Sequence, residues 1–295
     1  MAITGTGTQS DPWITQNYTD LASAFSLANG GAGNYIKLDD FDIDCNTYGS
    51  SFEWETLSLS NASVWVDLDL NGHAVKNVKV ASNNYMFSTG TGAASTIHNG
   101  QILNVFTSNA SGFVSCAEDL HLEELSLSLN GTGATSYFSN RAYYTNCAVY
   151  FEASKLDYMP FMNYDQANTL FTNCDIQFAI DNINGQRLIG KDTNYGGTTS
   201  GLDSCRLRGY IKGSTAANCV IGMCSMSNSV CDLDMLQATP SGSGNVFSGG
   251  TGVLNTDKIV AGMALTGSIV GVDSQQIVNG AALREAGFVV VNVVG

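Results

Sequence analysis

Proline and charge are both scarce in this chain. Only 3 of its 295 residues are proline, and charged residues make up 13% of the total, well below the usual quarter. Lysine and arginine together number 12 against 26 aspartate and glutamate residues, so the net charge is −14. A nucleic-acid surface needs a basic stripe that neutralises phosphates. The composition therefore predicts no nucleic-acid partner.

Long apolar runs are missing as well. No stretch approaches 18 apolar residues, so we expect no membrane-spanning helix and no membrane partner. The first residues have neither the basic start nor the apolar core of a secretory signal, which predicts synthesis in a reducing cytosol.

The common motifs of catalysis and cofactor binding are also absent. There is no Gly-Lys-Ser/Thr phosphate loop and no G-x-S-x-G nucleophile elbow. The eight cysteines include no C-x-x-C pair of the zinc type, and the nearest two, Cys219 and Cys224, are five residues apart. We therefore predict no catalytic residues, no cofactor and no metal site. We expect the cysteines to be buried, reduced thiols that pack as small apolar residues.

What the chain does contain is a short segment that recurs with a cysteine in its middle. A small polar pair precedes each cysteine and an alternating apolar segment follows it, at Cys147, Cys174, Cys205, Cys219 and Cys231. The first three cysteines are 27 and 31 residues apart, and the last two steps are 14 and 12 residues. Related segments without cysteine begin at Asn71, Asn99 and Glu123.

Such a repeat, with strands of about five residues, is typical of one turn of a parallel β-solenoid. Successive coils stack at about 4.8 Å, so equivalent residues form ladders. The predicted fold class is therefore all-β, a parallel β-helix in which the cysteines lie one above another on the inside. The last two steps are too short for a whole coil, so we place Cys219 on a second face or in a local hairpin.

Composition divides the chain into three predicted segments. Residues 1–34 form an N-terminal cap with a short helix over residues 20–29, which Thr19 or Asp20 caps and Gly30 and Gly31 end. Residues 35–238 form the β-helix. It includes an alternating strand from Phe41 to Cys45 that has Asp42 and Asp44 on its outer side.

The third segment follows a linker-like stretch that starts at Pro240. We predict that residues 246–295 are a small α+β module for assembly or attachment, with a helix capped by Asp273. Its last residues, Val289 to Val294, form an apolar run that we interpret as a buried strand or a subunit contact.

Parts of the chain resemble a known group of proteins. Residues 5–14, Gly-Thr-Gly-Thr-Gln-Ser-Asp-Pro-Trp-Ile, and residues 68–75, Leu-Asp-Leu-Asn-Gly-His-Ala-Val, resemble pectate-lyase-like β-helix proteins. Residues 265–272, followed by the expected helix and Ala286-Gly287-Phe288, are similar to the C-terminus of β-helix structural proteins of tailed bacteriophages. The resemblance implies a right-handed, single-stranded parallel β-helix.

The resemblance also implies a function. It predicts a non-enzymatic virion protein, made in the bacterial cytoplasm, that projects from the particle as a head fibre, capsid decoration or tail spike. The expected partners are two further copies in a homotrimer, a capsid or tail protein, and host surface polysaccharide. A polysaccharide depolymerase of the same fold is the first alternative, and a bacterial surface adhesin is the second.

Two kinds of residue are candidates for chemistry on such a rod. The pairs Asp42 with Asp44 and Asp67 with Asp69 each share a strand face and could meet a neighbour in the ladder, as the carboxylates of a glycosidase would; their simpler interpretation is a solvent-facing strand. Histidines are the second kind. His73 lies in a turn, and His98 has no nucleophile beside it in sequence.

Two clusters complete the candidates. His121 lies among Glu118, Asp119, Glu123 and Glu124, although Glu123 and Glu124 would point to opposite faces of a strand. A group of aromatic residues could stack host sugars or could pack inside the coils: Tyr137, Phe138, Tyr143, Tyr144, Tyr150, Phe151, Tyr158, Phe161, Tyr164 and Phe171.

Overall fold

The protein is represented by a computed structural model of the whole chain, and two compact units make up its architecture. The units are Met1–Asn130 with Arg141–Ala148, and Gly131–Asn140 with Val149–Gly295. The structure describes residues 3–61, 63–89, 94–107, 111–131, 139–154, 161–163, 169–181, 189–191, 199–212, 221–222, 224–236, 250–255, 268–269, 272–273 and 289–291.

The first unit begins with a helix and continues as short strands. Its helices are α1 (Tyr18–Asn29) and the 3-10 helix η1 (Cys45–Tyr48). Its strands are β1 (Trp13–Thr15), β2 (Tyr35–Leu38), β3 (Ile43–Asp44), β4 (Leu57–Leu59), β5 (Asp67–Asp69), β6 (Ala74–Lys79), β7 (Tyr85–Thr89), β8 (Ser95–Thr107) and β9 (Gly112–Gly131).

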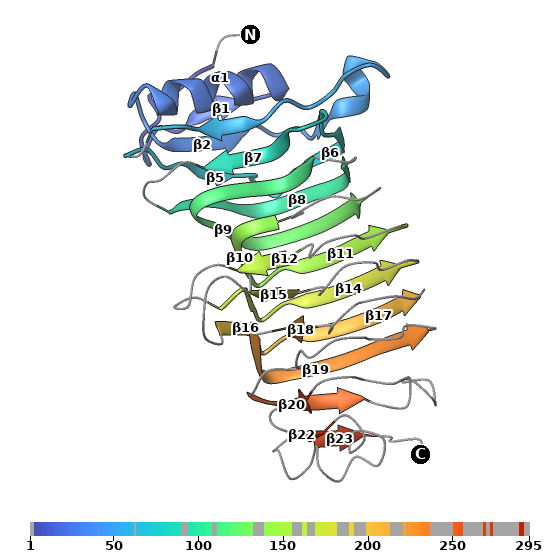
Figure 1. Cartoon of the computed structure of the whole chain (residues 1–295). Coiled ribbons are helices and arrows are strands. Elements are labelled where there is room, and N and C mark those ends of the chain that lie inside the picture. The colour runs from blue at the N-terminus through green and yellow to red at the C-terminus, as the bar shows by residue number, and fades with distance from the viewer. Residues whose placement is uncertain are drawn as a thin grey trace. The chain divides into compact units, whose positions relative to one another are not determined.

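The described strands of this unit pair in three parallel ladders (Figure 1). The ladders are β1–β2–β5–β8, β3–β6–β8 and β4–β7–β9. Each strand pairs with one that lies about a coil further along the chain, and such parallel connections are right-handed. The predicted fold class, a right-handed parallel β-helix, is confirmed.

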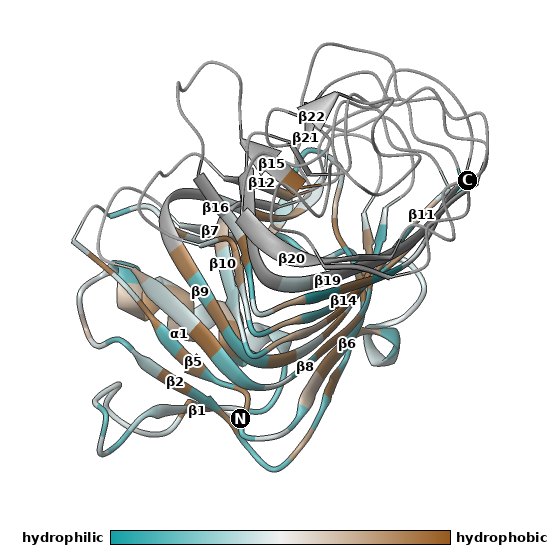
Figure 2. Cartoon of the chain, turned by 90° about the horizontal axis from the view of Figure 1, so that it is seen from below, coloured by the Kyte–Doolittle hydropathy of each residue, from teal (hydrophilic) through white to brown (hydrophobic). Residues whose placement is uncertain are grey.

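The interior follows from alternation along each strand. Ile36, Leu68 and Ile97 are neighbours in successive coils and are at most 1% exposed, whereas the residues on either side of them face outwards. Figure 2 shows the same alternation of apolar and polar residues along β8 and β9.

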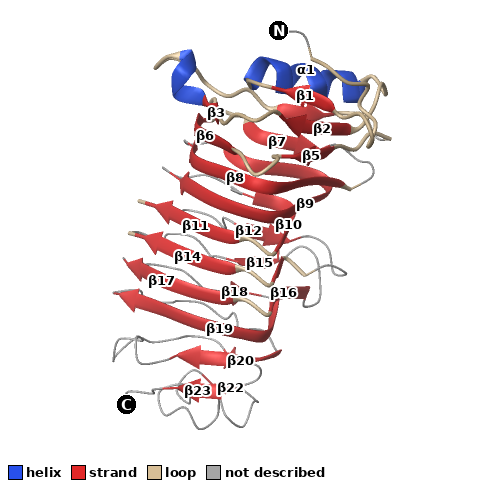
Figure 3. Cartoon of the chain, turned by 180° about the vertical axis from the view of Figure 1, so that it is seen from behind, coloured by secondary structure: helices blue, strands red, loops and turns tan. Residues whose placement is uncertain are grey.

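The N-terminal helix lies on the first coils, as expected of a cap (Figure 3). Its Leu21, Phe25 and Ala28 are buried, and the Phe25 ring lies 6.3 Å from that of Phe87. The helix begins earlier than predicted, because Asn17 rather than Thr19 or Asp20 is the N-cap. The Asn17 side chain accepts a hydrogen bond from the backbone N–H of Asp20.

The second unit contains the remaining strands. They are β10 (Ser139–Thr145), whose first two residues belong to it, β11 (Ala148–Ala153), β12 (Phe161–Asn163), β13 (Phe171–Thr172), β14 (Asp175–Ile180), β15 (Ile189–Lys191), β16 (Thr199–Asp203), β17 (Arg206–Lys212), β18 (Ile221–Gly222), β19 (Cys224–Leu236), β20 (Gly250–Asn255), β21 (Ser268–Ile269), β22 (Val272–Asp273) and β23 (Val289–Val291).

This unit repeats the architecture of the first. Its ladders are β10–β12–β15–β18, β13–β16–β19 and β11–β14–β17–β19–β20–β23. Phenylalanines fill the interior. Phe161 is fully buried, and its ring lies 5.4 Å from those of Phe151 and Phe171 and 6.1 Å from that of Phe178. The edge-to-face geometry of these pairs adds about 0.5–1.5 kcal/mol each to their burial.

The cysteine segment is a corner between two strands. Cys147, Cys174 and Cys205 each directly precede a strand, and the residue before each cysteine has left-handed backbone, with φ of 55°, 52° and 55° at Asn146, Asn173 and Ser204. Asparagine tolerates this conformation better than most residues, which explains its place before the cysteine.

The cysteine thiols satisfy backbone groups at this corner. Each thiol donates to the carbonyl two residues earlier, at 3.1 to 3.3 Å. The single thiol hydrogen of Cys147 or Cys205 can instead be donated to a carbonyl of an earlier coil, that of Leu122 or Phe171 respectively. The prediction of buried, reduced thiols is confirmed for these three residues and for Cys45.

The ladder below Cys205 differs from the predicted one. The backbone N–H of Cys205 donates to Ser229 Oγ at 2.8 Å, and Cys231 pairs instead with Leu207. Alignment of the segments by their cysteines was therefore wrong by two residues here, because serine performs the same task at the corner. Cys219 lies outside the described residues.

A second difference concerns the coil that contains the Asn71 turn. The predicted repeat aligned Asn71 with Asn99, but Asp69 pairs with His98 and Ala74 pairs with Gln101. The corner between the paired residues, Leu70–His73, is two residues longer than Asn99–Gly100 below it, so neither flanking strand keeps the spacing between the two asparagines.

A third difference lies at the start of the coils. Phe41 is 62% exposed, and only Ile43 and Asp44 form a strand, so the strand is shorter than predicted. The predicted alternation holds from Asp42 to Cys45, because Ile43 and Cys45 are buried whereas Asp42 and Asp44 lie on the outer side. Cys45 instead begins η1, for which Asp44 is the N-cap through its side chain.

The described strands near the C-terminus extend the ladder of the second unit. β20 pairs in parallel with β19, and β23, from the apolar final run, pairs in parallel with β20. Asp273 pairs with Ser268 in a short antiparallel pair. The linker at Pro240 and the helix expected after Asp273 lie outside the described residues, and the boundaries of the 246–295 module stay a prediction.

Candidate functional site

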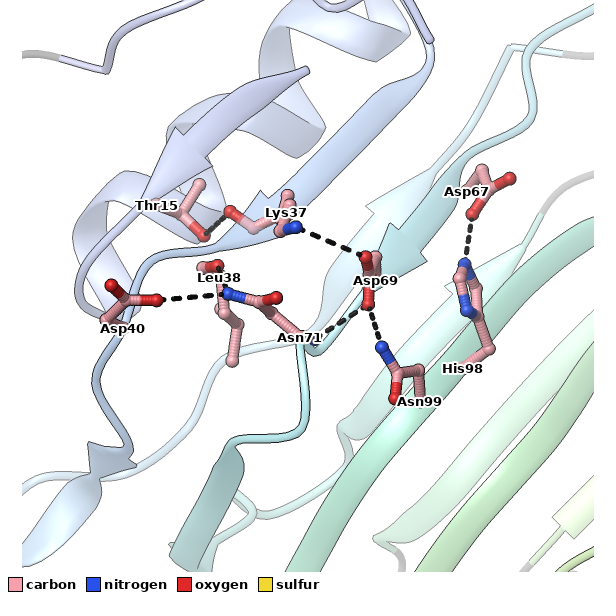
Figure 4. Close-up of polar contacts among 9 residues, drawn as sticks. All are labelled: Thr15, Lys37, Leu38, Asp40, Asp67, Asp69, Asn71, His98 and Asn99. Atoms are coloured by element: carbon pink, nitrogen blue, oxygen red, sulfur yellow. Dashed lines mark hydrogen bonds and ion pairs between the residues drawn. The ribbon is translucent and has the colours of Figure 1, made fainter. Parts of the chain in front are cut away.

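Polar side chains gather on the outer face of β2, β5 and β8 in the first unit. Lys37 faces outwards from β2, Asp67 and Asp69 from β5, and His98 from β8 (Figure 4). Tyr35 also faces outwards from β2. Their position follows from the buried Ile36–Leu68–Ile97 ladder, since residues on either side of an inward residue point outwards. We call these five residues the polar row.

One pair in the row joins a histidine and a carboxylate across two coils. His98 Nε2 lies 2.7 Å from Asp67 Oδ1, and the side chains are 31% and 33% exposed. In the tautomer that carries hydrogen on Nε2, the Nε2–H donates a hydrogen bond to Asp67, and Nδ1 is left as a hydrogen-bond acceptor. The pair can therefore bind a ligand hydroxyl or hold a proton.

Asp69, by contrast, has a structural role. Its Oδ1 accepts hydrogen bonds from the Asn71 backbone N–H at 2.7 Å and from Asn99 Nδ2 at 2.9 Å, and its Oδ2 lies 3.8 Å from Lys37 Nζ. Asp69 thus holds the Asn71 turn in place and partly neutralises Lys37.

A shallow hollow of about 360 Å³ lies over the row. Gln9 and Pro12 border it, together with Tyr35, Lys37, Asp67 and His98. The Tyr35 ring is held edge-on against Trp65, with ring centres 5.3 Å apart. The hollow presents donors, acceptors and one ring, which suits a small polyhydroxylated ligand.

The other predicted carboxylate pair is structural. Asp42 accepts from Lys76 Nζ at 2.8 Å and from the Ala74 backbone N–H at 3.0 Å, and these contacts lower the pKa of Asp42. Asp44 accepts from Asn77 Nδ2, and this hydrogen bond is the main reason that the pKa of Asp44 is also lowered. A glycosidase acid needs the opposite shift, so this pair is unsuited to protonating a leaving group.

The three histidines differ in their surroundings. His73 Nδ1 lies 3.6 Å from Asp42 in the turn where it was expected. His121 packs against the ring of Tyr143 at 5.7 Å. Glu123 and Glu124 both face outwards, contrary to the prediction, because Glu124 has left-handed backbone (φ 54°) and Leu122 and Leu125 therefore both point inwards.

Most of the predicted sugar-stacking aromatics whose side chains are described lie inside the coils. Tyr143, Tyr144, Phe151, Phe161 and Phe171 are at most 3% exposed, so they pack rather than present faces to solvent. Tyr150 is partly exposed and donates to Glu152 at 3.1 Å. Tyr137, Phe138, Tyr158 and Tyr164 lie outside the described residues.

The partner of His98 was not predicted from the sequence. Asp67 is 31 residues away, and the alignment of Asn71 with Asn99 placed His98 beside Leu70. The buried pattern Leu68-x-Leu70 followed by Ile97 offered a signal, because matching Leu68 with Ile97 brings Asp67 and Asp69 to the His98 side of the ladder.

Comparison with protein-family models, with curated proteins and with solved structures found no match to this chain. In the described residues, no helix is long and apolar enough to cross a membrane. Within the same part of the chain, no three histidine, cysteine, aspartate or glutamate side chains are grouped to hold a metal ion.

Proposed function

We propose that the chain is a non-enzymatic structural protein of a tailed-bacteriophage virion, a β-helix that projects as a head fibre, capsid decoration or tail spike. The observation that carries the proposal is the stacking of successive coils in parallel ladders, which the described strands form in each unit. Stacked coils satisfy one another's backbone groups, and such folds are extended and resistant to proteases.

The placement of the candidate chemical residues supports the same function. Asp42, Asp44 and Asp69 hold turns and neighbouring coils together. The buried aromatic rings fill the interior. The resemblance of residues 5–14, 68–75 and 265–272 to pectate-lyase-like and phage β-helix proteins supplies the virion context.

The test is to locate the chain on particles of the phage that encodes it. Purified particles are analysed by mass spectrometry and by electron microscopy with gold-labelled antibodies. We expect the chain to copurify at a fixed ratio to the capsid protein and the label to mark the head or the tail. Recovery of the chain only from the particle-free lysate would overturn the proposal.

Assembly as a homotrimer is part of the proposal. Native mass spectrometry at micromolar concentration should give three times the chain mass of 31.1 kDa. A species at the mass of one chain would rule out the trimer while leaving the virion location to the particle experiment.

A glycan-directed function is the second candidate, and the hollow over the polar row favours it. A depolymerase would release reducing ends or unsaturated uronates from the surface polysaccharide of the host. His98→Ala and Asp67→Asn should abolish that release, with Glu152→Gln as the control, because Glu152 is exposed and does not line the hollow. Failure of the unmodified chain to release either product would leave the structural function alone.

A further inference from the structure

Two cysteines of the second unit lie next to each other in adjacent coils. β14 and β17 pair in parallel with Asp175 opposite Arg206, which puts Cys174 and Cys205 at neighbouring positions just before the paired strands. The Cys174 backbone N–H donates to Cys205 Sγ at 3.4 Å, and the two thiols are close enough for one to donate to the other in place of a carbonyl. Both residues are 3% exposed.

This placement fits the covalent geometry of a disulfide. Equivalent residues of neighbouring strands are about 4.8 Å apart, and disulfides join Cα atoms that are about 4.4–6.8 Å apart. A corner outside the regular strand also lets the Cβ atoms approach without breaking the ladder, since neither cysteine belongs to the strand that follows it.

The surroundings of the two thiols also differ from those of a solitary buried cysteine. A hydrogen bond from Cys174 to Cys205 favours the thiolate and lowers the pKa of Cys205. Burial without such a partner raises the pKa of Cys45 to about 12. Cys45 is therefore a built-in control for a thiol that is buried but unreactive.

We propose that Cys174 and Cys205 form an oxidation site, where a hydroperoxide converts the two thiols into a disulfide that staples two successive coils. The site is independent of the proposed virion function. A chain folded in a reducing cytosol would carry the two thiols, and the link would form after transfer to an oxidising environment.

The reaction balances in two steps. The Cys205 thiolate attacks one oxygen of the peroxide, so an S–O bond forms, the O–O bond breaks and one water or alcohol leaves with a proton. The Cys174 thiolate then attacks the sulfenic sulfur, forming the S–S bond as the S–O bond breaks and a second water leaves. The two thiols lose two electrons and two protons, and the peroxide is reduced.

The probe is hydrogen peroxide, and the readout is peptide mass. Trypsin cuts after Arg187 and Lys191, which lie between the two cysteines, so Cys174 and Cys205 leave on separate peptides that contain no other cysteine. We expect the folded full chain, after oxidation, to yield these two peptides joined and lighter by two hydrogen atoms, and separate again after reduction.

Serine variants are the controls. Cys174→Ser and Cys205→Ser keep a hydroxyl that can serve the corner as Ser229 does, and each should fold and lose the joined peptide. Oxidation should raise the urea midpoint of the unmodified chain by about 1 M, reversibly, and should leave both variants unchanged. The Cys45 peptide should stay reduced throughout.

Access of peroxide to the buried pair is tested separately. The chain is also refolded from urea in a mixture of oxidised and reduced glutathione, so that the thiols meet the oxidant before burial. Recovery of Cys174 and Cys205 as thiols, sulfinic acids or disulfides to other cysteines in both treatments would overturn the proposal. The joined peptide after peroxide treatment would establish the proposal. The joined peptide after glutathione refolding alone would show that the two corners can be linked, and it would overturn the reaction with peroxide.

Discussion

Substitution of Asn173 tests the explanation of the recurring cysteine corner. Asn173 has φ of 52°, and its backbone N–H donates to the Asp203 carbonyl of the next coil at 2.9 Å. A left-handed conformation costs an ordinary residue about 1–2 kcal/mol, and for a β-branched residue the cost is at the upper end of this range or above it. Asn173→Val should therefore lower the free energy of unfolding by about 2 kcal/mol.

Glycine at the same position separates the effect of the backbone conformation on stability from the effect of the side chain. Asn173→Gly removes the side chain but accepts the conformation freely, so it should cost less than about 1 kcal/mol. Thr172→Val, one residue earlier in β13, is a control at a strand position and should also change little.

The assay is urea unfolding followed by circular dichroism, with the three variants compared by midpoint and slope. A total stability of about 5–15 kcal/mol makes a loss of about 2 kcal/mol readily measurable. If Asn173→Val and Asn173→Gly lost the same stability, the side chain rather than the left-handed backbone would decide the residue at this corner, and the reasoning would be refuted.

Three further predictions concern the interior, the backbone and pH. Phe161→Ala should cost about 3–5 kcal/mol, because three rings lose their contact, whereas Phe161→Leu should cost much less in the same urea assay. Gly209→Ala should cost more than about 2 kcal/mol, since φ is 113° and the new Cβ would lie 1.9 Å from the Phe178 carbonyl oxygen. Gly31→Ala, whose φ is 75° and whose Cβ meets nothing, should cost less in thermal melts, and equal losses would contradict the close approach. The pKa of Asp42 is lower in the folded chain, so the ionised carboxylate stabilises the fold above the unfolded pKa, and this stabilisation is lost on acidification below about pH 4. The melting temperature of Asp42→Asn should therefore fall less than that of the unmodified chain between about pH 6 and pH 3.

The fold class could be predicted because a solenoid repeats its constraints. The residue before Cys147, Cys174 and Cys205 meets the same left-handed corner each time, so the sequence repeats asparagine or serine there. The alternation of Leu68 and its neighbours likewise indicates a buried face.

Registers could not be predicted from the same repeat, because different side chains perform the same task. Ser229 replaces a cysteine at the corner, and matching cysteines alone therefore selected Cys231. Corners also vary in length, as at Leu70–His73, and a shift of a single residue changes which side chains face each other.

The polar row depends on such a register and was missed for this reason. Asp67 and Asp69 were predicted to share an outer face, and they do. Their partners His98 and Lys37 come from coils on either side, and only the pairing of β2, β5 and β8 brings them together. A local motif search cannot find a site whose members are separated by a whole coil of the chain.

Long-wavelength X-ray diffraction from crystals of the chain tests the stacked-coil ladder most directly, because sulfur scatters anomalously there and oxygen does not. The account predicts sulfur peaks for Cys174 and Cys205 on adjacent coils, about one strand spacing apart. It predicts no peak at the next position, where Ser229 lies, and the Cys231 peak beside Leu207. A Cys231 peak directly in line with Cys174 and Cys205, or those two sulfurs on unrelated elements, would contradict it.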